Sequence, residues 1–586
     1  MEENSCPLNA PLSLYNIAIK QLSCNIGCEN IFKNVYRDLP NHVLFDLYYQ
    51  MYRDNLLSVL RKEFSNIEIF SRLLILPDRK VKLLQCFQSN CYNTNADLIT
   101  SYANKCATIK ATSSDKIIRD LIDTGLRLGA FFSESGWFVD SAQVLYEVEL
   151  ICTNNLHLPF AEYKLLDCYH RLLHVQAVYC KFDDANNTVK QVLQLITKLR
   201  QNDKCPNVAG LYTELSVLHF IRSEYDKAYH WGVKALEHVD SSLPPSVIID
   251  VLRQASKACV VKRKFKKAYV LIRYAVNYTY EIFEDLHPKV ADVLMDYGFY
   301  LLNSDSILSS VKVYEEALDI RKQIFHKDNL KIAEAHEDIA YAVYVNEYTS
   351  GRFCSARDHA EQAIQIMEAL IPTDHLILAS AKRVKALILE EIALDLPGVN
   401  SQSRDKMKIL KEAEDLHLAA LKISLNAFGE KNVQTAKHYG NLGRLYQSMT
   451  EYEKAERMHL RAISVKEELL GDQDYEVALS IGHLASLYNY HMEKYREAEK
   501  LYLRSIAISL KLFGESYSGL EYDYRGLVHA YTELNEIYRM IDYSNTLSNW
   551  MELREQIVRG EDFPIRNNNT ERMSLKETLN KFFSMS

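Results

Sequence analysis

Among its 586 residues the chain shows no feature of a secreted or membrane-inserted protein. No charged start followed by an apolar core and a cleavage site opens it, and no apolar run approaches the roughly 20 residues that a transmembrane helix needs. Its net charge of −8 leaves no excess of lysine and arginine, which a nucleic-acid-binding domain ordinarily gathers on one face. We therefore expect a soluble, intracellular protein that inserts into no membrane and binds no nucleic acid.

Signatures of catalysis and of metal binding are absent as well. The sequence contains no phosphate-cradling glycine loop, no His-Glu-x-x-His helix and no nucleophile elbow. Its twelve cysteines are scattered without paired spacing, and Cys24 and Cys28 have no second pair nearby to complete a zinc site. We therefore expect a protein that is not an enzyme, with no catalytic residue, no metal ion and no cofactor.

What the chain does contain is a regular spacing of small residues. Two of them stand seven residues apart, and a third precedes the pair by twelve, as in Gly443, Ala455 and Ala462. Two antiparallel helices approach closely only where their side chains are small, so this spacing predicts paired helices. Leu442 and Leu484 hold the same position in successive units and are 42 residues apart, whereas a tetratricopeptide repeat has about 34. These longer units resemble the repeats of kinesin light chains.

The spacing predicts an all-α fold in which about ten tetratricopeptide-like hairpins form a solenoid over residues 111–555. Residues 1–110 lack the spacing and are expected to form an N-terminal helical module. Residues 556–586 form a polar tail, where Ser574 and Glu577 make a capping box before a short amphipathic helix. That helix either folds back on the solenoid or stays flexible with the rest of the tail.

A first short motif in the N-terminal module suggests attachment to a larger complex. Ser13, Leu14, Ala18 and Leu22 follow the spacing of the elongin-binding box of ubiquitin-ligase substrate receptors, although cysteine is the usual residue where Ala18 stands. Leu14, Ala18 and Leu22 are four residues apart each time, so they share one stripe of a helix. A partner could bind this stripe.

A second motif follows in the order that such receptors require. Leu39, Pro40 and Val43 match the cullin box, whose type here points to cullin-2, and Pro40 suits the first turn of a helix. Each motif also fits an ordinary core helix, because an amphipathic helix meets the first by chance and a helix-opening proline meets the second. The two together, ahead of a repeat array, favour the functional interpretation.

Three further stretches extend the likeness, namely Asp250–Cys259, Ala436–Tyr446 and Tyr517–Tyr522. From Leu12 to about Trp550 the chain resembles a family of tetratricopeptide-repeat substrate receptors of cullin-2 RING ubiquitin ligases. The resemblance implies a non-catalytic subunit that assembles with elongin B, elongin C, cullin-2 and a RING-box protein. It also implies that the subunit reads C-terminal degrons of the Arg-x-x-Gly type.

The same resemblance leaves a second role open. It implies association with microtubules and with the tail of the amyloid precursor protein, as a cargo adaptor in transport. The expected locations are accordingly the cytoplasm, the cytoskeleton and the nucleus. Against an adaptor joined to a motor by a coiled coil, residues 1–110 show no sustained heptads.

The first helices of stacked hairpins line the inner surface of a solenoid, so their outward positions are expected to bind the ligand. One set of these positions is acidic and the next is basic or amide-rich. An arginine-containing peptide with a free carboxylate would complement both sets. The alternative is a solvated lining held by internal ion pairs. The predicted peptide-binding residues are Asp292, Asp296, Glu334, Glu337, Asp338, Arg383, Lys437, Asn441, Arg444, His483 and Asn489.

Overall fold

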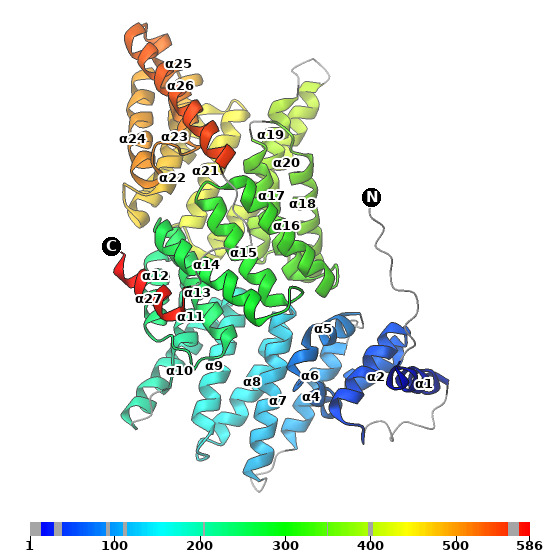
Figure 1. The fold of residues 1–586 in the computed structure, drawn as a ribbon. Helices are drawn as coiled ribbons and strands as arrows, with labels where there is room; N and C mark the ends of the chain where they lie inside the picture. Colours follow the sequence, from blue (N-terminus) through cyan, green and yellow to red (C-terminus); the bar gives the residue numbers. More distant parts are fainter. Residues whose placement is uncertain are drawn as a thin grey trace. The chain divides into compact units, whose positions relative to one another are not determined.

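The computed structural model describes residues 13–28, 38–89, 94–108, 114–202, 206–348, 350–396, 402–560 and 573–585. Within these ranges the chain forms 27 α-helices and one short 3-10 helix, and no β-strand (Figure 1). The predicted all-α fold is therefore confirmed. The chain divides into two compact units, with the main boundary after Pro206. The first unit also includes residues 286–288 and 322–327.

The first unit contains the N-terminal helices and the first two hairpins. Its elements are α1 (Leu14–Cys28), α2 (Asn41–Arg53), α3 (Leu57–Phe64), α4 (Ile67–Leu73), η3 (Pro77–Arg79), α5 (Lys80–Gln88), α6 (Thr94–Ala107), α7 (Asp115–Glu134), α8 (Phe138–Asn154), α9 (Ala161–Val178) and α10 (Phe182–Gln201).

Aromatic packing joins the N-terminal helices to the first hairpin. The ring of Phe87 on α5 lies 5.4 Å from that of Phe131 on α7 and 5.5 Å from that of Trp137. Phe70 on α4 lies 5.3 Å from Phe131, and all three phenylalanines are buried. Such clustered rings bury a large apolar area. The expected module of residues 1–110 thus shares its core with α7, and its expected limit at residues 110 and 111 lies outside the described residues.

The second unit consists of the later hairpins and a C-terminal helix, except that Pro288 and residues 322–324 belong to the first unit. Its elements are α11 (Ala209–Ile221), α12 (Tyr225–Glu237), α13 (Pro245–Val261), α14 (Phe265–Ile282), α15 (Pro288–Asn303), α16 (Ile307–Ile324), α17 (Leu330–Asn346), α18 (Cys354–Leu370), α19 (Leu376–Asp395), α20 (Gln402–Phe428), α21 (Val433–Ser448), α22 (Tyr452–Leu470), α23 (Tyr475–Tyr490), α24 (Tyr495–Phe513), α25 (Leu520–Glu533), α26 (Ile537–Gly560) and α27 (Leu575–Ser584).

Consecutive helices from α7 to α26 form ten pairs in the part of the chain that the structure describes. The small residues hold these pairs together. Ser216 donates a hydrogen bond to the carbonyl of Ala228 at 2.7 Å, and Ser256 does the same to Ala268 at 2.9 Å. Each of these bonds joins residues twelve apart, so the predicted spacing of twelve is the distance across one hairpin.

Glycine is required at Gly443 because an aromatic ring fills the space beside it. A Cβ atom there would lie 2.7 Å from the ring of His459 on the paired helix. Gly440, on the same helix α21, has room, since its Cβ would lie 3.7 Å from the nearest atom. The two glycines therefore differ in packing and not in helix propensity.

We expect Gly443→Ala to lower stability relative to Gly440→Ala by about 1–3 kcal/mol, the usual cost of overpacking. Both variants gain the same helix propensity, so their difference isolates the overlap with His459. The measurement is the thermal unfolding midpoint of each full-length variant. Equal midpoints would contradict this account of the glycine.

Early and late hairpins of the second unit contact one another. Phe265 at the start of α14 lies 5.6 Å from Phe513, ring to ring, and the guanidinium of Arg263 lies 4.6 Å from the ring of Tyr475. Asp305 accepts hydrogen bonds from Ser518 at 2.9 Å and from Arg554 at 2.7 Å. Early and late hairpins of the second unit therefore pack against each other, because these contacts join residues more than 200 positions apart.

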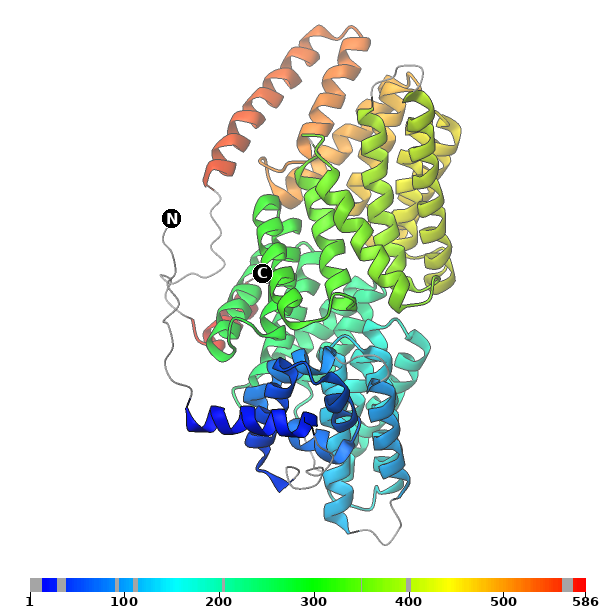
Figure 2. The ribbon, with the colours of Figure 1, turned by 90° about the vertical axis from the view of Figure 1, so that its right-hand side faces the viewer.

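The C-terminal segment forms a helix that packs back on the second unit. Ser574 and Glu577 make the predicted capping box at the start of α27. Phe582 is buried, and the ammonium of Lys267 on α14 lies 5.1 Å from its ring. Figure 2 shows α27, in red, beside green helices of the second unit, and among these α27 contacts α14. Of the two alternatives left open by the sequence, the structure has the helix folded back.

Candidate peptide-binding site

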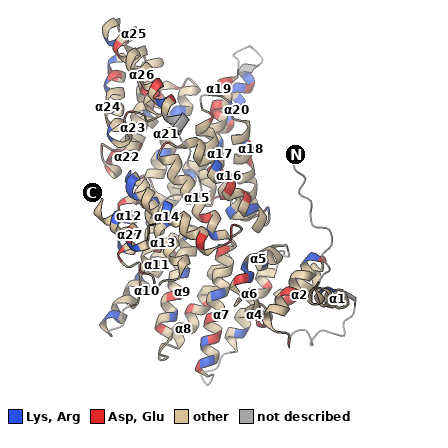
Figure 3. Ribbon diagram, in the orientation of Figure 1, with Lys and Arg blue, Asp and Glu red and all other residues tan. Residues whose placement is uncertain are grey.

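All eleven predicted peptide-binding residues lie on first helices of the second unit. These helices are α15, α17, α19, α21 and α23. From α17 to α23 each first helix contacts the next one directly, so together they form one continuous face. Acidic and basic residues both occur along the repeat helices of this unit (Figure 3). The ion pairs among them decide which charges remain for a ligand.

The two acidic residues of α15 are already neutralised by basic residues of the chain. Asp296 is 6% exposed and lies 2.9 Å from the Nε of Arg253 and 3.0 Å from the Nζ of Lys257. Asp292 lies 3.0 Å from the Nη2 of Arg321. Although burial opposes ionisation, the surrounding cations hold the pKa of Asp292 well below its usual value. Both carboxylates are thus part of internal ion pairs, the alternative that the sequence left open.

The three carboxylates of α17 remain without such a partner. Glu334, Glu337 and Asp338 lie three and four residues apart on one face of the helix. Across the described ranges, no lysine or arginine nitrogen approaches their oxygens within 4.0 Å. Because like charges this close repel one another, the cluster can be stabilised by an added cation.

The pKa values of these carboxyls are shifted accordingly. Desolvation raises the pKa of Glu337 to about 7, although Ser380 and Arg383 oppose the shift. Desolvation, together with the nearby charges of Glu337 and Glu334, raises the pKa of Asp338 to about 8, although part of its side chain is exposed to solvent. Desolvation also raises the pKa of Glu334. Ionisation of the cluster is therefore incomplete at neutral pH.

The predicted basic residues of α21 are largely occupied. Arg444 lies 3.1 Å from the Oε2 of Glu390 and 2.7 Å from the Oε1 of Glu391, and it donates to the hydroxyl of Tyr344 at 3.3 Å. Lys437 lies 2.9 Å from the Oε1 of Glu476. These cations are therefore engaged within the repeat array.

The remaining predicted residues differ in their availability. The guanidinium of Arg383 lies 5.3 Å from the ring of Tyr341, and no carboxylate oxygen among the described residues lies within 4.0 Å of it. Asn441 and His483 are partly exposed, and burial keeps His483 neutral by lowering its pKa well below the usual value. Asn489 is 1% exposed and donates to the carbonyl of Gly526 at 2.9 Å, so it joins two hairpins. Arg383 is thus the cation best placed to meet a carboxylate.

Helix α1 presents the predicted elongin-binding stripe to solvent. Leu14 is 83% exposed, Leu22 is 36% exposed and Ala18 is exposed as well. The opposite face holds the helix in place, because Ile19 and Ser23 are buried and Ser23 donates to Asp54 of α2 at 2.7 Å. The apolar stripe therefore has no core function within the described part of the chain.

The predicted cullin-binding segment begins α2. Pro40 is the N-cap of this helix, one residue before the predicted first turn, and it is exposed. Leu39 and Val43 are half-buried. Arg72 on α4 fixes the segment by donating to the carbonyl of Leu39 and, at 2.8 Å, to the side chain of Asn41.

Known proteins similar to this chain establish its repeats and its family. Models of the tetratricopeptide repeat match residues 406–468 and 477–516. "Amyloid protein-binding protein 2" of Rattus norvegicus is 50% identical over 550 residues, a match that covers 93% of this chain and 92% of that protein. The chain belongs to the amyloid protein-binding protein 2 family. The family member from Mus musculus matches with the same identity and coverage. These matches confirm the predicted tetratricopeptide repeats and the family likeness, whereas the predicted role in a cullin-2 ligase stays a prediction.

Some solved structures are similar to this chain at low sequence identity. A Rap protein complexed with competence and sporulation factor has a TM-score of 0.47 and 12% identity, with 67% of this chain and 98% of that chain covered. BtubC from P. vanneervenii has a TM-score of 0.29 and 17% identity, with 48% and 95% covered. Tetratricopeptide repeats are protein-interaction scaffolds, so the family member described here is a protein of that class. Among the helices that the structure describes, none has the length and hydropathy of a bilayer-crossing segment.

The residues that neutralise the predicted ones were not predicted from the sequence. Arg253 and Lys257 were detectable, because they stand four apart on α13, the first helix of the preceding hairpin. Glu390 and Glu391 were detectable as an adjacent acidic pair in the otherwise apolar stretch Ala386–Leu394 of α19. In both cases the signal in the sequence is a charged residue on the adjacent first helix, at a position that aligns with the predicted residue when the repeats are superimposed.

Proposed function

We propose that the protein is a non-catalytic substrate-recognition subunit of a cullin-2 RING E3 ubiquitin ligase. Elongin C, with elongin B, binds the stripe of Leu14, Ala18 and Leu22, and Ser13 begins the motif. Cullin-2 binds the segment of Leu39, Pro40 and Val43, and a RING-box protein joins through cullin-2. The observation that carries the proposal is the outward orientation of the stripe on α1, since exposed apolar patches mark interaction sites.

A pull-down of elongin B, elongin C and cullin-2 with the full-length chain tests this assembly. We expect Leu14→Asp to reduce their recovery at least tenfold, because a charge in the centre of an apolar contact is costly to desolvate. Lys20→Ala is the matched control, since Lys20 is exposed on α1 but lies off the stripe. Equal recovery by the Leu14→Asp variant and the wild type would refute the attachment.

The ligand in this proposal is a C-terminal degron of the Arg-x-x-Gly type. Its arginine binds Glu334, Glu337 and Asp338, because a guanidinium forms short, charge-assisted bonds to carboxylates. Its terminal carboxylate binds Arg383 on the next first helix, α19, and accepts a hydrogen bond from Asn441 on α21. Asp292, Asp296, Lys437 and Arg444 support this face through their ion pairs.

The affinity for an Arg-x-x-Gly peptide is expected to rise about tenfold or more from pH 6 to pH 8.5. Bound guanidinium favours the ionised carboxylates, so binding releases protons from groups whose pKa values are about 7 and 8 in the free protein. Fluorescence anisotropy of the labelled peptide at each pH measures this. A peptide with citrulline in place of arginine serves as control and should show no rise, because citrulline is uncharged. A flat profile for the arginine peptide would contradict the assignment.

A second candidate function is that of a microtubule- or kinesin-linked cargo adaptor, in the cytoplasm, on the cytoskeleton or in the nucleus. The observation that favours it is the 42-residue unit, longer than the usual repeat and similar to that of kinesin light chains. The relatives' name supports a ligand related to the amyloid precursor protein tail. Capture of that tail without any elongin or cullin-2 would favour this function.

A further inference from the structure

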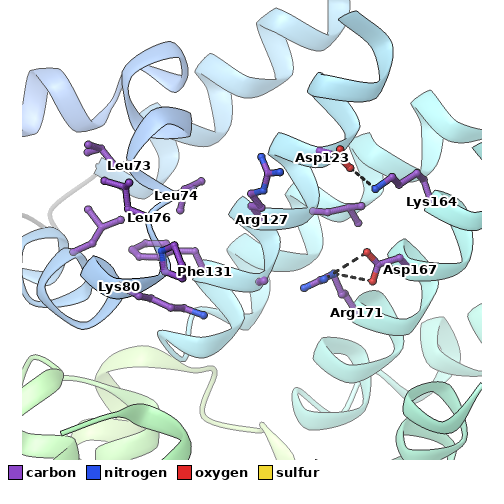
Figure 4. A pocket seen from close by; sticks show the side chains of 14 residues that line it. Leu73, Leu74, Leu76, Lys80, Asp123, Arg127, Phe131, Lys164, Asp167 and Arg171 are labelled. Carbon is purple, nitrogen blue, oxygen red and sulfur yellow. Dashed lines mark hydrogen bonds and ion pairs between the residues drawn. The ribbon is translucent and has the colours of Figure 1, made fainter. Parts of the chain in front are cut away.

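The first unit contains a cavity of about 320 Å³ that none of the preceding functions uses. Its walls come from α4, η3 and α5 on one side and from the first helices α7 and α9 on the other. Figure 4 shows Leu73, Leu74, Leu76 and Phe131 gathered on one side, whereas Arg127 and Arg171 lie toward the other. The volume is at the lower end of the range for small-ligand pockets.

The charges of this cavity are paired, with one exception. Lys164 lies 2.6 Å from the Oδ1 of Asp123, and the Nε of Arg171 lies 3.2 Å from the Oδ1 of Asp167. Lys80 is paired with Glu134 on α7. Arg127 is exposed, and no carboxylate oxygen in the described ranges lies within 4.0 Å of its guanidinium. The cavity therefore offers one uncompensated cation beside an apolar wall.

We propose that this cavity is a separate peptide-binding site for an internal motif in which an acidic residue adjoins a bulky apolar one. In an extended peptide, successive side chains point to opposite sides. An apolar side chain can therefore pack on the partly exposed Leu74 and Ala130 while the neighbouring carboxylate reaches Arg127. A guanidinium binds a carboxylate through two parallel hydrogen bonds, which fixes the register of the peptide.

Other ligand classes fit the same walls less well. A polyanion such as a nucleotide would face the carboxylates of Asp123 and Asp167, whose paired cations carry no excess charge for it. A purely apolar ligand would leave the Arg127 guanidinium unused. One carboxylate matches the one uncompensated cation, and the first helices α7 and α9 supply the surface on which repeat proteins bind extended chains.

This site is independent of the proposed degron site. It lies in the first unit and shares no residue with the face of the second unit. It selects an acidic side chain, whereas the carboxylates of the proposed degron site select a basic one. A peptide library fused at its C-terminal end to a carrier protein offers no free terminal carboxylate. Such a library therefore tests this site without engaging the degron site as proposed.

The probe is a displayed library of random nine-residue peptides of that kind, selected on the full-length chain. We expect enriched peptides to carry Asp or Glu directly beside Leu, Ile, Met or Phe. For the most enriched peptide, Arg127→Glu should weaken binding at least tenfold in fluorescence anisotropy, and Leu74→Asp should do likewise. Lys116→Glu, an exposed residue of α7 outside the cavity lining, should change it less than twofold.

Three outcomes would overturn the proposal. The first is the absence of any enriched acidic and apolar motif. The second is an affinity that Arg127→Glu leaves unchanged while circular dichroism shows the variant folded. The third is binding that persists when the acidic side chain is amidated and a free terminal carboxylate is added, because the ligand would then be a chain end.

Discussion

Replacing Glu337 and Asp338 together by lysine is expected to reduce the affinity for an Arg-x-x-Gly peptide at least a hundredfold. The substitutions turn a cluster of three carboxylates without ion pairs into a site with a net positive charge, which repels guanidinium. Since Asp338 is exposed and Glu337 is half-buried, the helix can accommodate both changes. Fluorescence anisotropy with an N-terminally labelled peptide that has a free carboxylate measures the loss.

Two control variants show whether the loss of affinity comes from the charge of this cluster. The isosteric variant Glu337→Gln with Asp338→Asn should lose at least tenfold, because it removes the negative charge and adds no repulsion. Glu315→Lys reverses an exposed charge on the second helix α16 and should leave affinity unchanged. Full affinity in both cluster variants, with helicity intact, would show that the arginine of the degron binds elsewhere.

Truncating Arg444 to alanine is expected to destabilise the second unit by about 3–5 kcal/mol, as observed when one partner of a buried ion pair is removed. Arg444 is the cation between two carboxylates, and Glu390 is 1% exposed. Without the guanidinium, Glu390 would be left desolvated and without an ion pair. The negative charge of the adjacent Glu391 would destabilise it further. The thermal unfolding midpoint should therefore fall by several degrees.

Arg461→Ala is the matched control for this experiment. Arg461 forms an ion pair with Glu430 at 2.7 Å, but the side chains are 40% and 67% exposed. Exposed pairs contribute about 0–1 kcal/mol because water screens them. Similar unfolding midpoints for the two variants would show that the ion pairs of Arg444 stabilise the protein no more than an exposed pair does. A larger loss of stability for Arg444→Ala would agree with the role proposed for Arg444, which is to stabilise the binding face through its ion pairs and not to contact the ligand.

The candidate site was predictable only in part, and particular residues show where the limit lies. The helical register places Asp292, Glu337 and Arg383 on first helices, because side-chain direction in a helix follows from spacing alone. The same register offers Arg253 and Lys257 as candidate partners on the preceding first helix, but it could not show that they neutralise Asp296 while Asp338 stays without an ion pair. Those differences depend on distances between the side chains of neighbouring hairpins, which spacing along a single helix does not determine.

Asn489 makes the same point for a neutral residue. Its position on α23 suggested a groove-lining amide, yet the adjacent hairpin covers it and Gly526 accepts its hydrogen bond. A residue near the end of a first helix faces either the groove or the next hairpin, depending on the angle at which that hairpin stacks. Sequence spacing carries little information about this angle.

The sequence by itself determined the all-α fold, the ten hairpins, the capping box of α27 and the family, because these depend on local periodicity and on identity along the chain. Only the tertiary structure decided that the Leu14 stripe faces solvent, that α27 packs on α14 and that the predicted acidic residues divide into paired and unpaired ones. The physical reason is that solvent exposure and charge neutralisation arise between helices distant in sequence. No spacing within a single helix contains that information.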